Sequence, residues 1–285
     1  MSRKLSLVAL CLAGSTTLIW ARVGASQEPA PQAPAAAPPQ ATAPSAHPSG
    51  AKVWIGRYAE YEEFLKSAPI ESLGAIPIGV LHPKQAFFVK GGLAGSGALK
   101  FIRPGRQSGF WESYKSEIAA YRLDRVLGMD MVPPTVERRA SGELGSLQLW
   151  IENCKLLKDV DQTEGSSSPS WMKQVRRQRT FDNLIANIDR NPGNLLVDDQ
   201  WNLILIDHSR AFASNGMPFM KEMQRIDREF YEKLKALDEA TLMRELKPWV
   251  LGTGEVRDLL KRRDKIIEQF DRLAKEKGEA AVFPF

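Results

Sequence analysis

The spacing of apolar residues along the chain predicts a segment rich in β-strands followed by a mostly helical one. Residues 57–67 and 116–127 repeat their apolar positions every three or four residues, as a helix that buries one face does. Gly128 and Pro133-Pro134 are expected to end the second of these helices. Short apolar runs predict four strands, the first three of them antiparallel, at 76–80, 85–89, 98–103 and 146–152.

After a serine-rich loop at 161–170 the pattern becomes helical. We expect a helix at 171–188, a hairpin at 195–207 and mainly helices beyond it. Together these elements predict an α+β, two-lobed fold, with a small β-rich N-terminal lobe at about 51–155 and a larger helical C-terminal lobe at about 170–285. A cleft between two lobes is the usual place for a ligand.

Two groups of basic residues lie on the predicted helices of the second half. We expect both groups to face water, although the first could meet an anionic substrate and the second a membrane surface. The first group is Lys173, Arg176, Arg177 and Arg179, and the second is Arg257, Lys261, Arg262 and Arg263.

The first 50 residues have the pattern of an exported protein. Arg3 and Lys4 precede an uncharged stretch at 5–21, and small residues predict cleavage after Ala25, so residues 1–25 are expected to be a signal peptide. The alternative is an uncleaved N-terminal membrane anchor. Residues 26–50 contain 15 Ala or Pro among 25 and predict a disordered linker, so the folded domain is expected at 51–285. The expected location is the periplasm, the extracellular space or a secretory lumen.

Composition narrows the function classes. With 43% hydrophobic and 26% charged residues, the chain is typical of a soluble globular domain. Its net charge is +5, but residues beyond the predicted signal peptide include 36 basic and 34 acidic side chains, which does not favour nucleic-acid binding. Cys11 lies within the signal peptide, which leaves Cys154 alone and excludes an intramolecular disulfide. We expect a monomer that needs no disulfide partner.

Three polar residues in the second half have a spacing that suggests phosphoryl transfer. Asp189 and Asn194 lie five residues apart in a Pro/Gly loop, and Asp207 follows an apolar strand thirteen residues later. Phosphoryl transfer needs one Asp to orient and deprotonate a hydroxyl, and an Asn and an Asp to hold magnesium on the phosphates. The alternative is a polar turn before a buried hairpin.

Two charged residues in the first half favour the same chemistry. Lys100 lies in an apolar strand, and Glu117 opens the next helix 17 residues later. In kinases a strand lysine held by a helix glutamate grips the nucleotide phosphates. Taken singly, each residue could also be an ordinary surface charge.

Five segments together resemble a known group of enzymes. They are SEIAAYRLDRVLG at 116–128, VPPT at 132–135, GSLQLWIE at 145–152, FDNLIANIDR at 181–190 and IDHSRAF at 206–212. In this order they resemble type II phosphatidylinositol 4-kinases and the secretory-pathway (Golgi casein-kinase-like) atypical kinases, and more distantly HipA-type kinases.

This resemblance implies a kinase that uses ATP with Mg²⁺ or Mn²⁺ and transfers the γ-phosphate to a hydroxyl of a protein, a glycan or a lipid head group. It makes Lys100 the phosphate-binding lysine, Glu117 its partner and Asp189 the catalytic base. It also makes Asn194 and Asp207 the metal ligands. The adenine would lie against backbone groups of Trp150, Ile151 and Glu152, up to Asn153.

The chain departs from ordinary protein kinases at several positions. It has no G-x-G-x-x-G motif, and its phosphate loop would be 79–84, where Lys84 either contacts phosphate or belongs to a plain turn. Ile188 stands in place of the His before the catalytic Asp, and Ser209 in place of the Gly of Asp-Phe-Gly. Two alternatives therefore stay open: a pseudokinase that binds nucleotide or a partner without transfer, and a structural domain with accidental motifs.

Overall fold

The computed structural model describes residues 51–76, 83–107, 109–161, 163, 165, 167–212, 223–250 and 253–285. They belong to one compact unit, Ala46–Phe285. The expected signal peptide and linker at 1–50 lie outside the described residues, as do most of the expected first strand and most of the expected phosphate loop. Within the described ranges, none of the helices combines the length and apolar character needed to cross a membrane.

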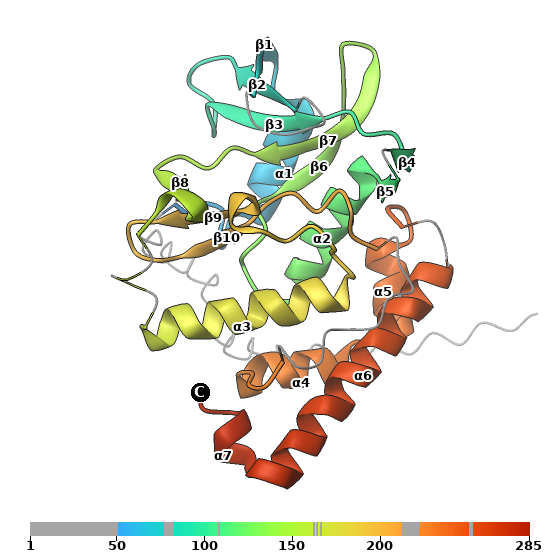
Figure 1. The fold of residues 1–285 in the computed structure, drawn as a ribbon. Helices are drawn as coiled ribbons and strands as arrows, with labels where there is room; N and C mark the ends of the chain where they lie inside the picture. Colours follow the sequence, from blue (N-terminus) through green and yellow to red (C-terminus); the bar gives the residue numbers. More distant parts are fainter. Residues whose placement is uncertain are drawn as a thin grey trace, which may run out of the picture. The chain divides into compact units, whose positions relative to one another are not determined.

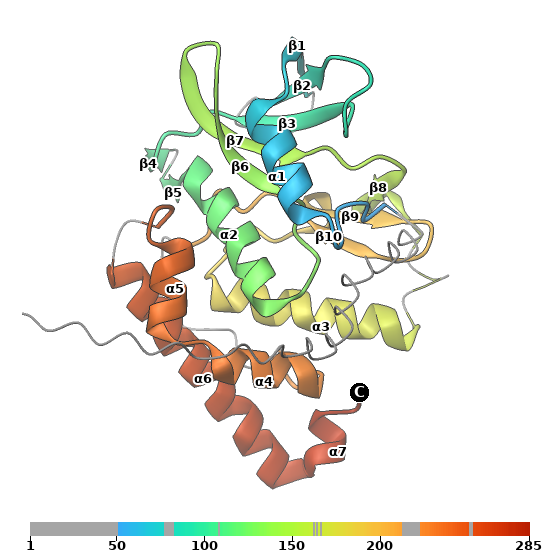
Figure 2. The same ribbon diagram turned by 180° about the vertical axis from the view of Figure 1, so that it is seen from behind.

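A five-stranded antiparallel sheet forms the N-terminal part (Figure 1). Its strands lie in the order β1-β2-β3-β7-β6, so that β3, which carries Lys100, occupies the centre. Helix α1 (Tyr58–Ser67) packs on one face of this sheet, as Figure 2 shows, and buries Tyr61 and Leu65 in the same cluster as Leu99. The strands are β1 (Ile70–Ala75), β2 (Lys84–Phe88), β3 (Ser96–Lys100), β6 (Thr135–Ala140) and β7 (Glu143–Leu149).

The sequence prediction of this sheet is only partly confirmed. Strands β2, β3 and β7 match predicted strands, whereas strand β1 at 70–75 was not predicted. Most of the strand expected at 76–80 lies outside the described residues. Strand β6 went unpredicted because Glu137, Arg138 and Arg139 interrupt its apolar pattern. The Arg138 guanidinium donates to the carbonyl of Ala68 at 2.8 Å, so this charged strand residue helps hold the end of α1.

Helix α2 (Tyr114–Leu127) connects the sheet with the helical part. Ser113 caps its first turn by accepting from the Lys115 amide, and Gly128 ends it in the left-handed conformation (φ 57°), as predicted. Ala119, Leu123 and Leu127 belong to the large core that the C-terminal helices share. Between β3 and α2 the chain forms a small hairpin of β4 (Gly105–Gln107) and β5 (Phe110–Glu112).

The C-terminal part is mainly helical, as predicted, and gives the chain the α+β, two-lobed fold (Figure 1). A three-stranded sheet, ordered β10-β9-β8, lies next to its first helix. The helices are α3 (Pro169–Leu184), α4 (Arg228–Ala236), α5 (Glu239–Leu246), α6 (Thr253–Lys277) and α7 (Glu279–Val282), with 3₁₀ turns η1 (Leu157–Asp159) and η2 (Pro192–Asn194). The strands are β8 (Cys154–Leu156), β9 (Leu195–Asp198) and β10 (Leu203–Leu205).

The helix predicted at 171–188 ends earlier, at Leu184. Ala186 turns the chain with a φ of 51°, and the carbonyl of Ile185 accepts the amide of Phe212 at 2.7 Å. The sequence pattern predicted a longer helix because the residues just after Leu184 are buried or apolar, although they are not helical. The early end of α3 leaves residues 185–191 as a loop that contains Asp189, and Asn194 ends the η2 turn that follows.

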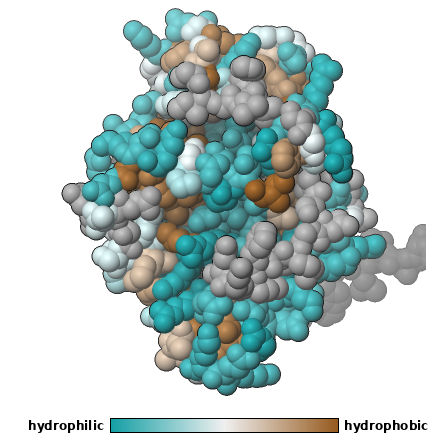
Figure 3. Space-filling view, viewed as in Figure 1, coloured by the Kyte–Doolittle hydropathy of each residue, from teal (hydrophilic) through white to brown (hydrophobic). Residues whose placement is uncertain are grey.

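Two arginines expected to face water are buried. Arg177 forms an ion pair with buried Asp227 at 2.5 Å, and Arg262 on α6 donates to the carbonyl of Leu184 at 2.7 Å. Both therefore stabilise the packing of α3. The sequence did not predict this, because a buried arginine and a solvated one look the same in the sequence. On the face shown in Figure 3, hydrophobic residues form small patches separated by hydrophilic ones.

Candidate functional site

Lys100, Glu117 and Asp207 meet where the sheet, helix α2 and the segment after β10 come together. The Lys100 ammonium donates to Glu117 Oε1 at 2.5 Å and to Asp207 Oδ1 at 2.9 Å. Glu117 is 2% exposed, and its second oxygen accepts the backbone amide of His208 at 3.0 Å. The structure thus brings together three of the five residues that sequence reasoning singled out for phosphoryl transfer.

The charges of this cluster depend on one another. Burial lowers the pKa of Lys100, but the two carboxylates outweigh it and raise that pKa above its usual value. Burial opposes ionisation of Asp207, yet Lys100 and the Ser209 hydroxyl lower the pKa of Asp207 to about 2. Burial raises the pKa of Glu117 against the opposing effect of Lys100. Lys100 and Asp207 are therefore charged at neutral pH.

Asp207 has an unusual backbone conformation. Its φ of 58° lies in the left-handed region, which few residues other than glycine adopt without cost. Its Oδ1 accepts from Lys100 and, at 3.2 Å, from the Ser209 hydroxyl, whereas no side chain or amide in the described ranges hydrogen-bonds to its Oδ2. The conformation therefore directs one carboxylate oxygen to Lys100 and leaves the other available to a ligand.

Asp189 lies in the loop after α3, with its backbone held from three sides. Its amide donates to Asn187 Oδ1 at 3.3 Å, and its carbonyl accepts the side-chain amides of Asn191 at 3.0 Å and Asn194 at 2.9 Å. Its carboxylate is 38% exposed and forms an ion pair through Oδ2 with Arg210 at 3.1 Å. No hydrogen bond from the described part of the chain reaches its Oδ1.

Arg190 is a residue that sequence reasoning missed, and it organises this loop. Its guanidinium forms an ion pair with Asp182 of α3 at 2.9 Å, and both side chains are almost fully buried. It also donates to the backbone carbonyls of Asn194 and, at 2.8 Å, of Ile206. Arg190 therefore joins α3, the Asp189 loop and the segment before Asp207. Only its position directly after Asp189 could have suggested this role.

His208 is a buried, neutral support of the site. Its Nε2 lies 2.9 Å from Arg190, and because a guanidinium can only donate, Nε2 must accept and the ring proton must be on Nδ1. Burial, together with the charges of Arg190 and Lys100, lowers the pKa of His208 well below 6.5. The imidazole is therefore not positioned to exchange protons with a substrate near neutral pH.

Two free oxygens could hold a divalent cation. A carbonyl only accepts, so the Asn194 side chain must present its nitrogen to Asp189, and no hydrogen bond within the described part of the chain reaches its Oδ1. The amide of Ile206 donates to the Asn194 carbonyl at 3.3 Å, which joins the two segments. Asn194 Oδ1 and Asp207 Oδ2 are oxygen donors of the kind that Mg²⁺ and Mn²⁺ take, and these ions complete their shells with water and substrate phosphates.

A metal site made by the protein alone is not found in the described residues, where no group of three or more His, Cys, Asp or Glu side chains could hold an ion. The two oxygens of Asn194 and Asp207 would therefore need further ligands from a bound substrate. This agrees with the way magnesium is usually held, through one or two carboxylates and the phosphates of a nucleotide.

The residues expected to bind adenine follow β7 directly. The Trp150 amide donates to the Ser96 carbonyl at 3.2 Å, so it is already used within the sheet. The Ile151 carbonyl accepts the Cys154 thiol at 3.2 Å. Glu152 is exposed. The Trp150 amide is therefore already paired, and contact of adenine with the backbone of residues 150–153 stays a prediction.

Lys84 begins strand β2 and is exposed. It pairs in register with Leu99 of β3, next to Lys100 in sequence. The remainder of the expected phosphate loop, 79–82, lies outside the described residues. A contact between Lys84 and phosphate therefore stays a prediction.

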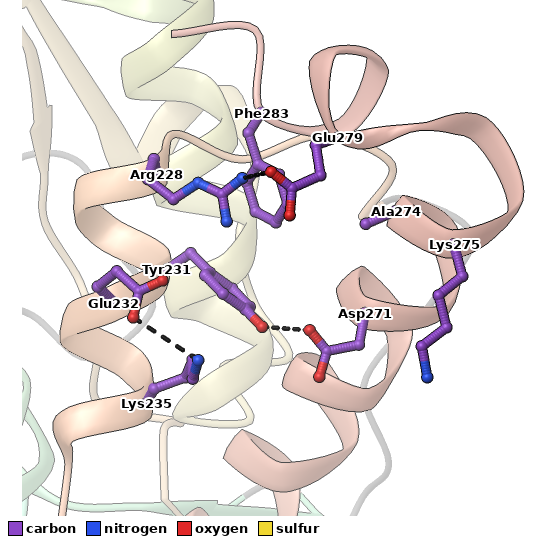
Figure 4. A pocket seen from close by; sticks show the side chains of 9 residues that line it. All are labelled: Arg228, Tyr231, Glu232, Lys235, Asp271, Ala274, Lys275, Glu279 and Phe283. Carbon is purple, nitrogen blue, oxygen red and sulfur yellow. Dashed lines mark hydrogen bonds and ion pairs between the residues drawn. The ribbon is translucent and has the colours of Figure 1, made fainter.

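A pocket of about 360 Å³ lies among α4, α6 and α7 (Figure 4). It does not contain any of the predicted site residues, and most of its charged groups pair with other side chains that line it. Arg228 contacts Glu279 at 2.7 Å, and Tyr231 donates to Asp271. We therefore place the candidate site at Lys100, Glu117 and Asp207.

Comparisons with known proteins support this interpretation of the fold. No family model matches the sequence. The sequence is 35% identical over 111 residues to the protein "Phosphatidylinositol 4-kinase gamma 4" of Oryza sativa subsp. japonica. That match covers 32% of this chain and 19% of the relative, so the chain matches about a fifth of the length of that protein.

Similar solved structures cover more of the chain. The golgi casein kinase superposes with a TM-score of 0.61 and 14% identity over 80% of this chain and 79% of its own. The hydra Fam20 structure with sugar also has a TM-score of 0.61, with 16% identity over 79% of this chain and 91% of its own. The chain thus has the two-lobed kinase-like fold of these proteins and resembles the atypical kinases, the Golgi casein kinases and phosphatidylinositol 4-kinases among them.

Proposed function

We propose that the protein is an ATP-dependent phosphotransferase that moves the γ-phosphate of ATP to a hydroxyl group. The observation that carries this proposal is the placement of Lys100 between Glu117 and Asp207, at 2.5 and 2.9 Å. A lysine paired with a helix glutamate, beside an aspartate able to hold a metal, is the arrangement that binds nucleotide phosphates in kinases. A solved golgi casein kinase holds Mn and ADP, which supports a nucleotide and a divalent cation here.

Each group has one task in this mechanism. Lys100, held by Glu117, attracts the phosphates and neutralises part of their charge. Asn194 Oδ1 and Asp207 Oδ2 would hold Mg²⁺ or Mn²⁺, which supplies further positive charge on the phosphates. Asp189 orients the acceptor hydroxyl and takes up its proton on Oδ1, while the γ-phosphate passes to the acceptor oxygen and ADP leaves.

The acceptor is a hydroxyl of a protein, a glycan or a lipid head group. The names of the similar proteins include a casein kinase and a phosphatidylinositol kinase, and each suggests a different acceptor class. We also propose that the protein acts outside the cytoplasm, on the basis of the charged start, apolar stretch and small residues within 1–25.

The proposal is tested with the purified full-length chain and ATP labelled in its γ-phosphate, with Mg²⁺ and with Mn²⁺. Dephosphorylated casein, an oligosaccharide and phosphatidylinositol vesicles serve as acceptors in separate reactions. We expect label on one acceptor or on the chain itself, and about 10²- to 10⁴-fold slower labelling with Asp189→Asn. Binding of ATP with metal but no transfer to any acceptor would favour the pseudokinase, and absence of both would contradict the proposed site.

A further inference from the structure

Arg210 lies between three groups near the candidate base. Its Nε donates to Glu112 at 2.6 Å, and one terminal nitrogen lies 3.1 Å from Asp189 Oδ2. Its guanidinium carbon lies 4.6 Å from the ring centre of Phe110. Glu112 is 1% exposed and Arg210 is 19% exposed, so this contact is largely shielded from water. Ion pairs of this kind are screened less than surface pairs.

The backbone on either side of Arg210 is fixed to the start of α2. The Ser113 amide donates to the Ser209 carbonyl at 2.9 Å. The Ser116 hydroxyl donates to the Ala211 carbonyl at 3.0 Å. Because both neighbours of Arg210 are held, its side chain is directed toward the β4–β5 hairpin, from which Phe110 and Glu112 come.

The carboxylate of Asp189 has few other restraints. Its backbone is held by Asn187, Asn191 and Asn194, but these bonds do not reach its carboxylate oxygens. Among the described residues, Arg210 alone forms an ion pair with Asp189. A planar guanidinium can contact two carboxylates at once, which a single ammonium does less well. Arg210 thus fixes Oδ2 and leaves Oδ1 for the acceptor.

We propose that Arg210 is a positioning residue that orients the Asp189 carboxylate and connects it to the β4–β5 hairpin. This inference rests on the proposed function, because it takes Asp189 as the base. It also means that turnover depends on Glu112, which lies in the β4–β5 hairpin between the Lys100 strand and α2. Neither Arg210 nor Glu112 is among the residues that sequence reasoning assigned to the site.

The experiment compares Arg210→Lys with a matched control, Arg228→Lys, in the full chain. Arg228 also pairs with a glutamate, Glu279 at 2.7 Å, and lies 3.7 Å from the ring centre of Phe283 (Figure 4). Lysine keeps the positive charge next to buried Glu112, so the variant should fold. We expect Arg210→Lys to lower kcat by about 10- to 100-fold through misplacement of Asp189, with an unchanged KM for ATP. The control should leave both constants unchanged.

A second measurement does not need activity. Amide hydrogen exchange at 187–191 should be faster in Arg210→Lys than in Arg228→Lys, because the catalytic loop loses a contact to the hairpin. In addition, Glu112→Gln should lower kcat, and the double variant Glu112→Gln/Arg210→Lys should be no slower than Arg210→Lys alone, because Glu112 acts through Arg210.

The outcomes separate this inference from the proposed function. If the wild-type chain transfers no phosphate, the proposed function is wrong, and hydrogen exchange alone decides whether Arg210 holds the loop. Equal exchange in Arg210→Lys and Arg228→Lys overturns the inference. So does an active Arg210→Lys whose kcat equals that of the control, or one whose loss lies wholly in the KM for ATP.

Discussion

Glu117 accepts the backbone amide of His208 at 3.0 Å and thereby ties helix α2 to the segment that carries Asp207. Its other oxygen holds Lys100 at 2.5 Å. One buried carboxylate therefore positions both the candidate phosphate-binding lysine and the candidate metal ligand. Moving α2 would displace both at once, and this is why Glu117 is central to the site although it would not touch the substrate.

The pairing of Lys100 and Glu117 predicts that the two residues act as a unit. Lys100→Met and Glu117→Gln should each weaken binding of ATP with Mn²⁺, and the double variant should lose less than the sum of the two losses. The measurement is a double-mutant cycle by calorimetry. The exposed pair Lys265 and Glu268, 2.7 Å apart, provides a control cycle that should leave ATP affinity unchanged. Fully additive losses at 100 and 117 would show that their contact has no part in binding.

Arg190 should be important for stability as well as for turnover. Arg190→Met leaves the buried Asp182 carboxylate without its ion-pair partner, and breaking such a buried pair typically costs about 3 to 5 kcal/mol. Arg272→Met removes a solvent-exposed pair with Glu276 and should cost at most about 1 kcal/mol. Urea unfolding of both variants measures the two free energies. Similar values would mean that Arg190 does not hold the loop.

The buried carboxyl group of Asp124 should make the folded state less stable as the pH rises. It is fully buried, and burial raises its pKa from 3.8 to about 7, although its Oδ1 accepts the amides of Met131 and Val132. The folded state therefore binds a proton that the unfolded state has lost between pH 4 and 7, so this group destabilises the fold as the pH rises.

Asp124→Asn removes the ionisable group, so the stability of this variant relative to the wild type should increase as the pH rises from 4 to 7. The difference between pKa values of 3.8 and about 7 sets an upper bound of about 4 kcal/mol on this gain. Urea unfolding at both pH values checks it. A difference that stays constant, or that shrinks with rising pH, would show that the Asp124 pKa is not raised by folding.

Much of the fold could be predicted from local pattern. The apolar stripe of α2 and the glycine after it predicted that helix and its end, and short apolar runs predicted β2 and β3. The β4–β5 hairpin and β6 could not be predicted in this way, because their strands are short or strongly polar. Their stability comes from contacts with distant residues, such as Arg138 with the end of α1.

The candidate site was predictable where a motif requires a particular residue type. Lys100, Glu117 and Asp207 were found in this way, and the structure brings them together. Arg190 and Arg210 were not found, because arginines near a charged loop usually face water. Only the fold shows that the first contacts Asp182 and the second contacts Glu112.

Calorimetric binding of ATP with Mn²⁺, compared with phosphate transfer for Asp189→Asn and Asp207→Asn, tests the central claim most directly. In the proposed mechanism Asp189 contacts the acceptor and not the nucleotide, so Asp189→Asn should keep ATP affinity while transfer falls by about 10²- to 10⁴-fold, the usual contribution of general-base catalysis. Asp207 would hold the metal, so Asp207→Asn should lose both metal-dependent affinity and transfer. Equal loss of ATP binding in the two variants, or unchanged transfer in both, would contradict the site described here.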